Sequence, residues 1–320
     1  KKSINEIGKD VIDLQIKALR KLRNSLNNSF DLAVRTLLKC RSKVIVCGVG
    51  KSGIIASKIS ATLSSIGTPS FSISANDCSH GDLGRITNKD ILILISNSGN
   101  TLELKNIIKY ARSNKIFLIG IVSNKSSDLY KYSNIKLSIP EVEESGLGIV
   151  PTSSTTSQLA IGDALSISLM RKKKFGKLDF KKFHPSGNLG NKLKTAGDLM
   201  LIKNKIPLIN ENQKMKSALK VINSKQLGFL VVVNNKGLTT GVFTDGDLKR
   251  LMQRKKKIDN IIIKSYMTKN PYKVEENSLA TDVLSLMNKK KITNMCIYKK
   301  DNKRKTIGVL HIHHLLDNLG

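Results

Sequence analysis

One short stretch decides the fold of the first half of the chain: it runs from Lys43 to Gly53 and reads KVIVCGVGKSG. An apolar, β-branched run ends in glycines at positions 48, 50 and 53, and apolar residues at helical spacing follow as far as Ser65. A buried strand that turns through glycines into a helix is the repeating unit of parallel α/β sheets. We therefore expect a parallel sheet built around this strand.

The alternation of strand and helix continues on both sides of this stretch. Upstream, apolar residues three and four apart predict amphipathic helices over residues 4–26 and 30–38. Downstream, the pattern predicts strands at 70–74, 90–95, 117–122 and 135–139 and helices at 53–65, 103–113 and 155–170. Such strands, rich in Ile, Val and Leu and separated by helices, predict a parallel sheet with helices on both faces. We expect this first domain to cover residues 1–193.

The second half of the chain contains an internal repeat. Gly241–Leu248 (GVFTDGDL) matches Gly308–Leu315 (GVLHIHHL) at a displacement of 67 residues, and the same displacement aligns two further pairs of apolar residues. Each copy is predicted to hold a helix, two strands and a closing helix. We therefore expect two α+β units, at residues 194–258 and 259–320.

The chain is strongly basic: its 320 residues include 55 Lys and Arg against 24 Asp and Glu, a formal net charge of +31. Aromatic residues make up only 4% of the chain, and there is no Trp. Binding of single-stranded nucleic acid by stacking requires aromatic side chains beside the cations. We expect no nucleic-acid partner and interpret most of the charge as solvated surface.

Compartment and redox state follow from the apolar runs and the cysteines. The longest apolar runs, such as residues 44–49 and 91–95, are far shorter than the roughly 18 residues that span a membrane. The start of the chain shows no signal-peptide pattern. The four cysteines form no Cys-x-x-Cys pair, which is typical of free thiols in a reducing compartment. We expect a cytoplasmic protein without a membrane partner.

The glycine stretch alone is weak evidence for a nucleotide site. It matches the Gly-x-Gly-x-x-Gly pattern, but the next strand, Ser70–Ser74, lacks the acidic residue that would hold a ribose. A P-loop would need a glycine where Ile45 stands. The remaining interpretation is a turn whose backbone N–H groups and helix N-terminus face an anion, with Lys51 beside them.

Two more strand-to-helix junctions are rich in hydroxyl groups. Residues 96–101 (SNSGNT) follow the strand at 90–95, and residues 152–156 (TSSTT) precede the last long helix of the first domain. An ordinary N-cap would explain one or two of these hydroxyls, but not both clusters. The carboxyl ends of parallel strands meet at one edge of a sheet, so we expect one crevice there that binds a phosphate monoester.

These residues carry a family resemblance. The first domain resembles the sugar isomerase fold called SIS, and the repeat resembles a tandem pair of CBS motifs. With HGDLG at 80–84 and HPSGNLG at 184–190, the chain is similar to the arabinose-5-phosphate isomerase family over essentially its whole length. The resemblance implies an isomerase that interconverts D-ribulose 5-phosphate and D-arabinose 5-phosphate, the first step toward the Kdo sugar of lipopolysaccharide. It also implies a homo-oligomer, a tetramer, that needs neither a metal nor an organic cofactor.

The resemblance also assigns site residues. The family's catalytic residues fall on Lys51, Glu103, one of Glu143 and Glu144, and His184. Counting back from Pro151 favours Glu143, whereas counting forward from the SNSGNT cluster favours Glu144. The substrate-binding residues fall on Ser52, Gly67, Thr68, His80, Ser96, Asn97, Ser98, Thr101 and Thr155.

Aldose–ketose isomerisation suits these residue types. A proton moves between C1 and C2 through an enediol, which requires a base, groups that exchange protons with the sugar oxygens, and a cation near the developing oxyanion. Our hypothesis gives the first role to one of the two adjacent glutamates, the second to His184 and His80, and the third to Lys51. Ser74 replaces a family histidine that helps to bind inhibitory zinc, so we expect no tightly held metal.

The repeat has a candidate ligand site of its own. Thr244 and Asp247 match positions that hold the ribose of an adenosyl ligand in CBS modules, which implies a nucleotide or sugar-nucleotide effector. The second copy has His311 and His314 at these positions, so its site is doubtful, and we do not interpret these histidines as a metal cluster.

Two other functions remain open at this point. A non-catalytic sugar-phosphate sensor would share the fold, although such regulators normally carry a DNA-binding domain before it, for which the roughly 40 residues ahead of the first strand leave no room. A paralogous isomerase of sugar-alcohol or capsule metabolism would catalyse the same reaction.

Overall fold

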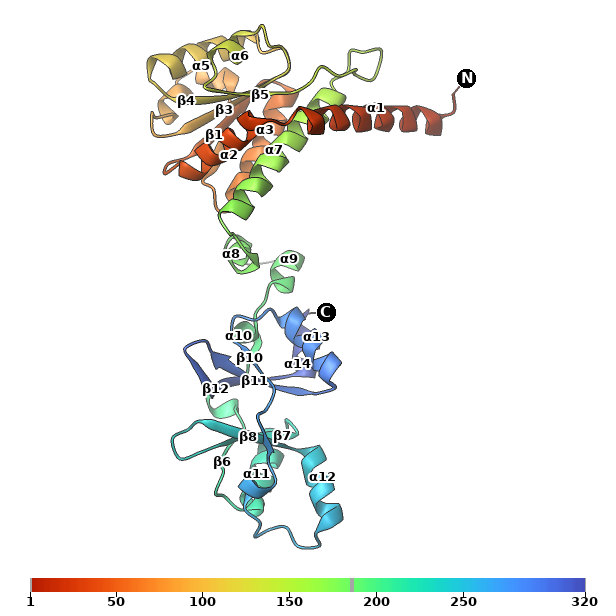
Figure 1. Cartoon of the computed structure of the whole chain (residues 1–320), viewed down its shortest axis with the longest axis vertical. Helices are drawn as coiled ribbons and strands as arrows, with labels where there is room; N and C mark the ends of the chain where they lie inside the picture. Colours follow the sequence, from red (N-terminus) through yellow and green to blue (C-terminus); the bar gives the residue numbers. More distant parts are fainter. Residues whose placement is uncertain (1, 185–186, 320) are drawn as a thin grey trace. The chain divides into compact units, whose positions relative to one another are not determined.

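The computed structural model describes residues 2–184 and 187–319, which form two compact units, Lys1–Phe183 and His184–Gly320 (Figure 1). The first unit is a parallel sheet of five strands in the order β2-β1-β3-β4-β5. Its strands are β1 (Val44–Gly48), β2 (Ser70–Ser74), β3 (Ile91–Ser96), β4 (Phe117–Val122) and β5 (Ile135–Ser138). Every strand predicted for this unit is present, which confirms the parallel α/β fold.

Helices flank this sheet. They are α1 (Ile4–Ser25), α2 (Asn28–Lys39), α3 (Lys51–Ser65), α4 (Ala75–Cys78), a 3₁₀ turn (Asp82–Arg85), α5 (Leu102–Ser113), α6 (Asp128–Tyr132), α7 (Ser153–Lys172) and α8 (Lys177–Phe183). The long helices agree with the prediction within a few residues. The short helices α4, α6 and α8 were not predicted, because four to seven residues are too few to show a helical period.

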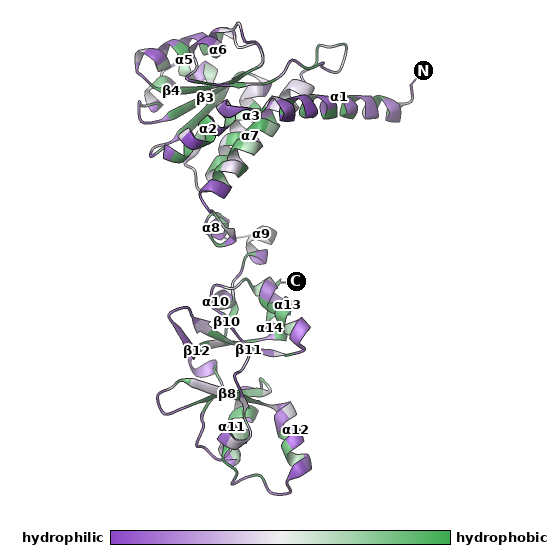
Figure 2. Cartoon of the chain, viewed as in Figure 1, coloured by the Kyte–Doolittle hydropathy of each residue, from purple (hydrophilic) through white to green (hydrophobic). Residues whose placement is uncertain are grey.

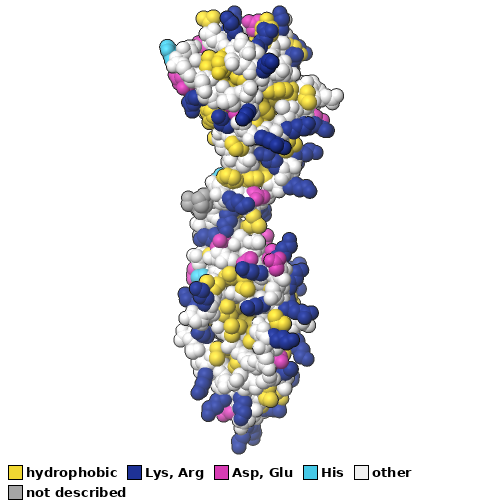
Figure 3. All heavy atoms as spheres, turned by 90° about the vertical axis from the view of Figure 1, so that its left-hand side faces the viewer, with side chains coloured by type: hydrophobic (Ala, Val, Ile, Leu, Met, Phe, Trp, Pro, Cys, Tyr) yellow, Lys and Arg dark blue, Asp and Glu magenta, His cyan; other side chains and the backbone are white. Residues whose placement is uncertain are grey.

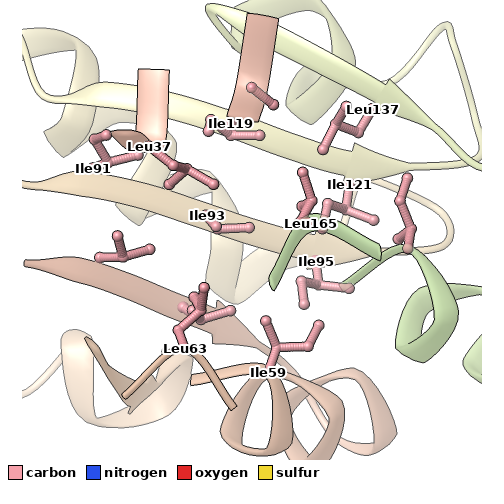
Figure 4. Close-up of a cluster of buried hydrophobic side chains, with 14 of the residues drawn as sticks. Leu37, Ile59, Leu63, Ile91, Ile93, Ile95, Ile119, Ile121, Leu137 and Leu165 are labelled. Atoms are coloured by element: carbon pink, nitrogen blue, oxygen red, sulfur yellow. The ribbon is translucent and has the colours of Figure 1, made fainter. Parts of the chain in front are cut away.

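Buried side chains cover both faces of the sheet. On one face, Ile93 of β3 and Ile119 of β4 belong to a buried cluster with Ile59 of α3 and Leu165 of α7 (Figure 4). On the other face, residues of β1 and β3 pack against helices α4 and α5. Neighbouring residues of a strand point to opposite faces, so a continuous apolar run is needed to fill both layers.

Helices α3 and α7 pack unusually closely and run parallel. A Cβ atom at Gly162 of α7 would lie 2.3 Å from the Cδ1 atom of Ile59 on α3, so only glycine fits there. Lys58 and Asp163 form an ion pair between the two helices, and Lys173 binds the carbonyl of Gly67 farther along both. In both contacts the α7 partner lies almost the same number of residues after its α3 partner, so the two helices run in the same direction. Both therefore begin at the same edge of the sheet.

Helix α1 leaves the body of the first unit. Ser3 and Glu6 form a capping box at its start, yet only Ala18 and Leu22 of the helix are buried. Ile4, at its free end, is 91% exposed. Figure 2 shows that most of the projecting part is hydrophilic, as the charged residues among its apolar positions require.

The second unit contains the predicted repeat. Its elements are α9 (Gly187–Lys192), α10 (Ala196–Leu199), β6 (Leu208–Asn210), α11 (Met215–Lys225), β7 (Phe229–Val233), β8 (Thr239–Thr244), α12 (Asp245–Arg254), β9 (Thr268–Lys269), β10 (Lys273–Glu275), α13 (Ala280–Lys290), β11 (Asn294–Lys299), β12 (Asn302–His311) and α14 (Ile312–Leu319), with 3₁₀ turns at Lys203–Lys205 and Ile263–Ser265. Strands β6, β7 and β8 of the first copy form one sheet with β9, which belongs to the second copy, and β10, β11 and β12 form the other sheet.

The two copies of the repeat pack on each other. Thr239 and Thr306, which are 67 residues apart and therefore equivalent, share a hydrogen bond of 2.7 Å between their hydroxyls. Phe229 and Val231 of the first copy belong to one buried cluster with Cys296 and Val309 of the second. The predicted pair of α+β units is confirmed.

The surface carries the excess positive charge. Figure 3 shows Lys and Arg side chains spread over both units rather than gathered in one stripe. Among residues 2–184 and 187–319, no helix is both long and apolar enough to span a membrane.

Candidate active site

The order of the strands places a topological switch point at the carboxyl edge of the first sheet. Gly48 at the end of β1 pairs with Ser74 of β2 on one side and with Ile95 of β3 on the other. The chain leaves β1 toward β2 and leaves β3 toward β4, so the loops after β1 and β3 diverge. Ligands of open α/β sheets bind at such switch points.

The loop after β1 leaves the N-terminus of α3 open. Gly50 is its N-cap residue, with φ +58°, and provides no side-chain cap. A Cβ atom at Gly48 would lie 2.6 Å from the carbonyl oxygen of Ser52, so the turn requires glycine there as well. Lys51 is exposed and Ser52 half-buried at the start of the helix. The first N–H groups of α3 are therefore available to an anion.

The loop after β3 is held by its own hydroxyl groups. The buried Ser96 hydroxyl accepts the N–H of Gly99 at 3.0 Å and lies 3.1 Å from the hydroxyl of Thr101. Thr101 precedes α5 but does not cap it with its side chain. Asn97 and Ser98 are exposed at the tip of the loop. Helix α5 thus also begins uncapped at the crevice, with Glu103 half-buried in its first turn.

The two adjacent glutamates have different surroundings. The carboxylate of Glu144 accepts the N–H groups of Thr152 (2.7 Å), Ser153 (2.8 Å) and Ser154 (3.2 Å) at the N-terminus of α7. Burial acts to raise the pKa of Glu144, but the Ser154 side chain and then these N–H groups outweigh it and hold the pKa below its usual value. Glu143, by contrast, is exposed and lines a small hollow with residues of α1.

Two further predicted residues lie at the same edge. Thr155 is in the first turn of α7, which begins at the same edge as α3, and its hydroxyl donates to the carbonyl of Thr152 at 2.9 Å. His80 is exposed shortly after α4, which follows β2 directly. Ser74 accepts an N–H group of α4 and acts as its N-cap.

Gly67 and Thr68 lie at the opposite edge of the sheet. They follow the C-terminal end of α3, and a helix of 15 residues separates its two ends by about 22 Å. Helix α8 packs at this edge, since Phe183 stacks on Phe175 and both rings lie against Gly67. His184 is the next residue of the chain after Phe183.

The predicted site residues therefore divide between two edges. The carboxyl edge holds Lys51, Ser52, His80, Ser96, Asn97, Ser98, Thr101, Glu103 and Thr155, with Glu144 at the start of α7 and Glu143 beside it. The opposite edge holds Gly67 and Thr68, and the chain enters His184 from there. One chain does not bring the whole predicted set together.

Sequence reasoning missed a lysine at the opposite edge. Lys173, just after α7, donates to the hydroxyl of Thr68 at 2.6 Å and to the carbonyl of Gly67 at 3.1 Å. It stands in the run RKKK at 171–174, where nothing in the sequence distinguishes it from its exposed neighbours. Only the pairing of α7 with the end of α3 identifies it.

The second unit contains a cavity of about 750 Å³ between the two copies of its repeat. The predicted pair Thr244 and Asp247 lines it, together with Arg250, His311 and His313. Asp247 accepts both the N–H and the hydroxyl of Thr244 at 2.9 Å and forms an ion pair with Arg250. Burial, with smaller effects of the neighbouring histidines, lowers the pKa of His311. No three potential ligands gather around a metal position in the described part of the chain.

Comparisons with known proteins match the two units to different families. Residues 37–168 match the SIS domain family, and residues 196–254 and 263–320 match the CBS domain family. The arabinose 5-phosphate isomerase KdsD of Yersinia pestis is 38% identical over 97% of this chain and 94% of its own length. That of Francisella tularensis is 37% identical over 95% of this chain and 93% of its own.

Two other relatives add to this. An uncharacterized protein of Rickettsia prowazekii is 39% identical over 97% of this chain and 96% of its own length. Among solved structures, a protein of Escherichia coli CFT073 in complex with arabinose 5-phosphate is 36% identical, with a TM-score of 0.55. The match covers 57% of this chain and 97% of that one.

Proposed function

This chain belongs to the arabinose 5-phosphate isomerase family, and from that premise we propose that it interconverts D-ribulose 5-phosphate and D-arabinose 5-phosphate. The observation that carries the proposal is the carboxyl-edge crevice, where two helices begin without side-chain caps beside Lys51 and the hydroxyls of residues 96–101. A phosphate monoester is the ligand that these donors fit. This reaction is the first step of Kdo and lipopolysaccharide biosynthesis.

The phosphate is held first. Helices α3 and α5 begin at the carboxyl edge without side-chain caps, and the hydroxyls of Ser52, Ser98 and Thr101 lie in the same two strand-to-helix junctions. Ser96 is already bonded to Gly99 and Thr101, so it shapes the loop and keeps Thr101 in place. This anchor fixes the distance from the phosphate to C1 and C2, which lowers the entropy cost of the reaction.

Proton transfer between C1 and C2 then requires a base. Glu144 is bonded to the N-terminus of α7, and its lowered pKa makes it a weak base. Neighbouring residues in an extended chain point in opposite directions, and Glu143 has no such anchor. We assign the proton shuttle to Glu143, and Lys51 stabilises the enediolate oxygen. His184 and His80 exchange the hydroxyl protons.

The division of the site between two edges supports assembly of several copies. We propose that Gly67, Thr68 and His184 of one subunit complete the carboxyl-edge crevice of another, in a homotetramer. Closed symmetry allows each subunit to give one half-site and receive the other. Because His184 acts with the first unit in this arrangement, we assign residues 1–193 to the isomerase domain, 194–258 to the first CBS motif and 259–320 to the second.

The decisive test is an NMR time course of the purified chain with ribulose 5-phosphate in deuterated water. Arabinose 5-phosphate that carries deuterium at C2 is the expected product, because a base that exchanges with solvent returns a deuteron. Saturable binding of the sugar phosphate without turnover would instead identify a sensor. Activity confined to other phosphorylated sugars would point to sugar-alcohol or capsule metabolism.

We further propose that the cavity of the second unit binds a nucleotide or sugar nucleotide as an effector. Asp247 and Thr244 offer oxygens to a ribose, and Arg250 and Lys291 are cations of the same lining that can bind a phosphate. Titration calorimetry with AMP, ATP and CMP-activated sugars tests this, with Asp247→Ala as the variant. No saturable binding to the wild-type chain would leave the pair as an assembly element.

The cysteines bear on where the enzyme works. All four are free, and three of them are buried. Free thiols persist in a reducing compartment, so we propose the cytoplasm as its location. Fractionation of cells that produce the tagged protein tests this directly.

A further inference from the structure

Lys173 is an ammonium group held against uncharged partners. Its two hydrogen-bond acceptors are the Thr68 hydroxyl, at 2.6 Å, and the Gly67 carbonyl, at 3.1 Å. It takes part in none of the ion pairs found among the described residues. The side chain is partly buried, and this burial lowers the pKa of Lys173, opposed by a smaller effect of Cys40. A cation without a carboxylate partner costs free energy in such a place.

The turn that Lys173 binds is fixed from several sides. Thr68 is only 3% exposed. Gly67 has φ +72°, and a Cβ atom there would lie 2.7 Å from the ring of Phe175, which itself stacks on Phe183. The packing around Gly67 and the burial of Thr68 restrict this turn, and the ammonium donates to the Thr68 hydroxyl within it.

The direction of that hydrogen bond matters. The ammonium has only donors, so the Thr68 oxygen accepts and its own proton is left to donate elsewhere. A hydroxyl that accepts a bond from a cation becomes a stronger donor, because hydrogen bonds in a chain polarise one another. Because Thr68 is buried, this hydrogen bond acts on the shape of the turn: the Lys173 ammonium ties the Thr68 hydroxyl to the Gly67 carbonyl. The half-buried Gly67 is the part of the turn that a ligand can reach.

We propose that Lys173 is a positioning residue of the isomerase reaction: it holds the Gly67–Thr68 turn in the geometry that meets the sugar phosphate bound by a neighbouring copy. The proposal rests on the proposed function, since it requires both the reaction and the completion of the site between subunits. It adds a residue that neither the motifs nor the family resemblance indicate.

Steady-state kinetics of four variants test this. Lys173→Met is expected to raise KM for ribulose 5-phosphate about tenfold with a smaller effect on kcat, because positioning acts on binding of the substrate. Lys173→Arg, which still donates to Thr68, should restore most of the loss. Lys172→Met removes the same charge one residue away on an exposed side chain, and Lys58→Met breaks the other contact between α3 and α7. Both controls should retain the wild-type KM.

A double-mutant cycle separates positioning from loss of structure. Thr68→Val removes the hydroxyl but keeps the shape, and in combination with Lys173→Met it should raise KM no further than either change alone. Additive effects, or an unchanged KM in a folded Lys173→Met protein, would overturn the role of Lys173. If Lys173→Met does not fold, Thr68→Val and Lys173→Arg decide: a wild-type KM in Thr68→Val contradicts the proposal.

The activity of the wild-type protein distinguishes a failure of the role of Lys173 from a failure of the proposed function. An active wild type with unchanged variants rejects only the role of Lys173. A wild type that does not isomerise ribulose 5-phosphate rejects the proposed function, and the positioning role falls with it.

Discussion

The two edges of the sheet in the first unit use their polar groups in opposite ways. At the carboxyl edge, α3 and α5 begin without side-chain caps, and Lys51 and Ser98 are exposed. At the opposite edge, the Thr68 hydroxyl is buried and bonded to Lys173. At the first edge the helix starts have no side-chain caps, whereas at the second the polar groups of the turn are already bonded within the chain. This difference is what we expect if, as proposed above, a single chain carries two half-sites rather than one complete site.

The largest effect is expected at Glu143. If it is the proton shuttle, Glu143→Gln lowers kcat about a hundredfold to ten-thousandfold, because general base catalysis is lost. Its exposed side chain implies an unchanged melting temperature. Pre-steady-state and steady-state rates of deuterium incorporation at C2 measure the loss. Full activity of this variant would move the base to another residue of the carboxyl edge.

The second-largest effect is expected for Lys51→Ala. Its kcat should fall by about a hundredfold, the usual effect of removing one group that stabilises an oxyanion. Lys51→Arg is the matched control, since it keeps the charge at the start of α3. Recovery by Arg would indicate an electrostatic role. If both variants retain wild-type kcat, the carboxyl edge does not stabilise the enediolate.

The next prediction concerns the pH dependence of the stability that Glu144 contributes through its bonds to the start of α7. Its folded-state pKa is lowered, so its contribution to stability is present above the unfolded-state pKa, near 4.3, and is lost as the pH falls through the folded value. Glu144→Gln should therefore cost about 1 kcal/mol near pH 7 and much less near pH 3. Urea unfolding at several pH values measures this. An equal cost at both pH values would mean that charge is not what holds the start of α7.

The smallest expected effect is that of the protein's long-range electrostatic field on substrate binding. The net charge of +31 favours a doubly anionic substrate at either edge, and salt screens that attraction. We expect KM to rise a few-fold between about 0.05 and 0.5 M NaCl, with kcat unchanged. An equal rise for a neutral sugar analogue would exclude an electrostatic origin.

Much of the fold was accessible from the sequence. Apolar runs such as Val44–Val46 predicted the strands, and the position of the hydroxyl clusters after a strand or before a helix predicted the sheet edge on which they lie, because both are local patterns. The roles of Glu144 and Lys173 were not accessible. Each depends on which helix end packs beside it, and the sequence cannot tell Glu144 from Glu143, or Lys173 from Lys172, without that packing.

The same reasoning explains the division of the site. The family resemblance assigned Gly67, Thr68 and Lys51 to one site, because matching residues in a sequence gives no distances between them. The length of α3 separates them by about 22 Å within the chain. A list of matched residues does not say which of them lie close together in one chain, and under our proposal the two groups meet only when several copies assemble.

Mixing two inactive variants tests this account most directly. Lys51→Ala impairs the carboxyl-edge half-site and His184→Ala the opposite one, so each protein alone should be nearly inactive. After the two are unfolded and refolded together in equal amounts, about a quarter of the sites should contain two intact halves, and isomerase activity should return to that fraction of wild type. A mixture as inactive as its parts, with native mass and melting temperature, would contradict a site shared between subunits.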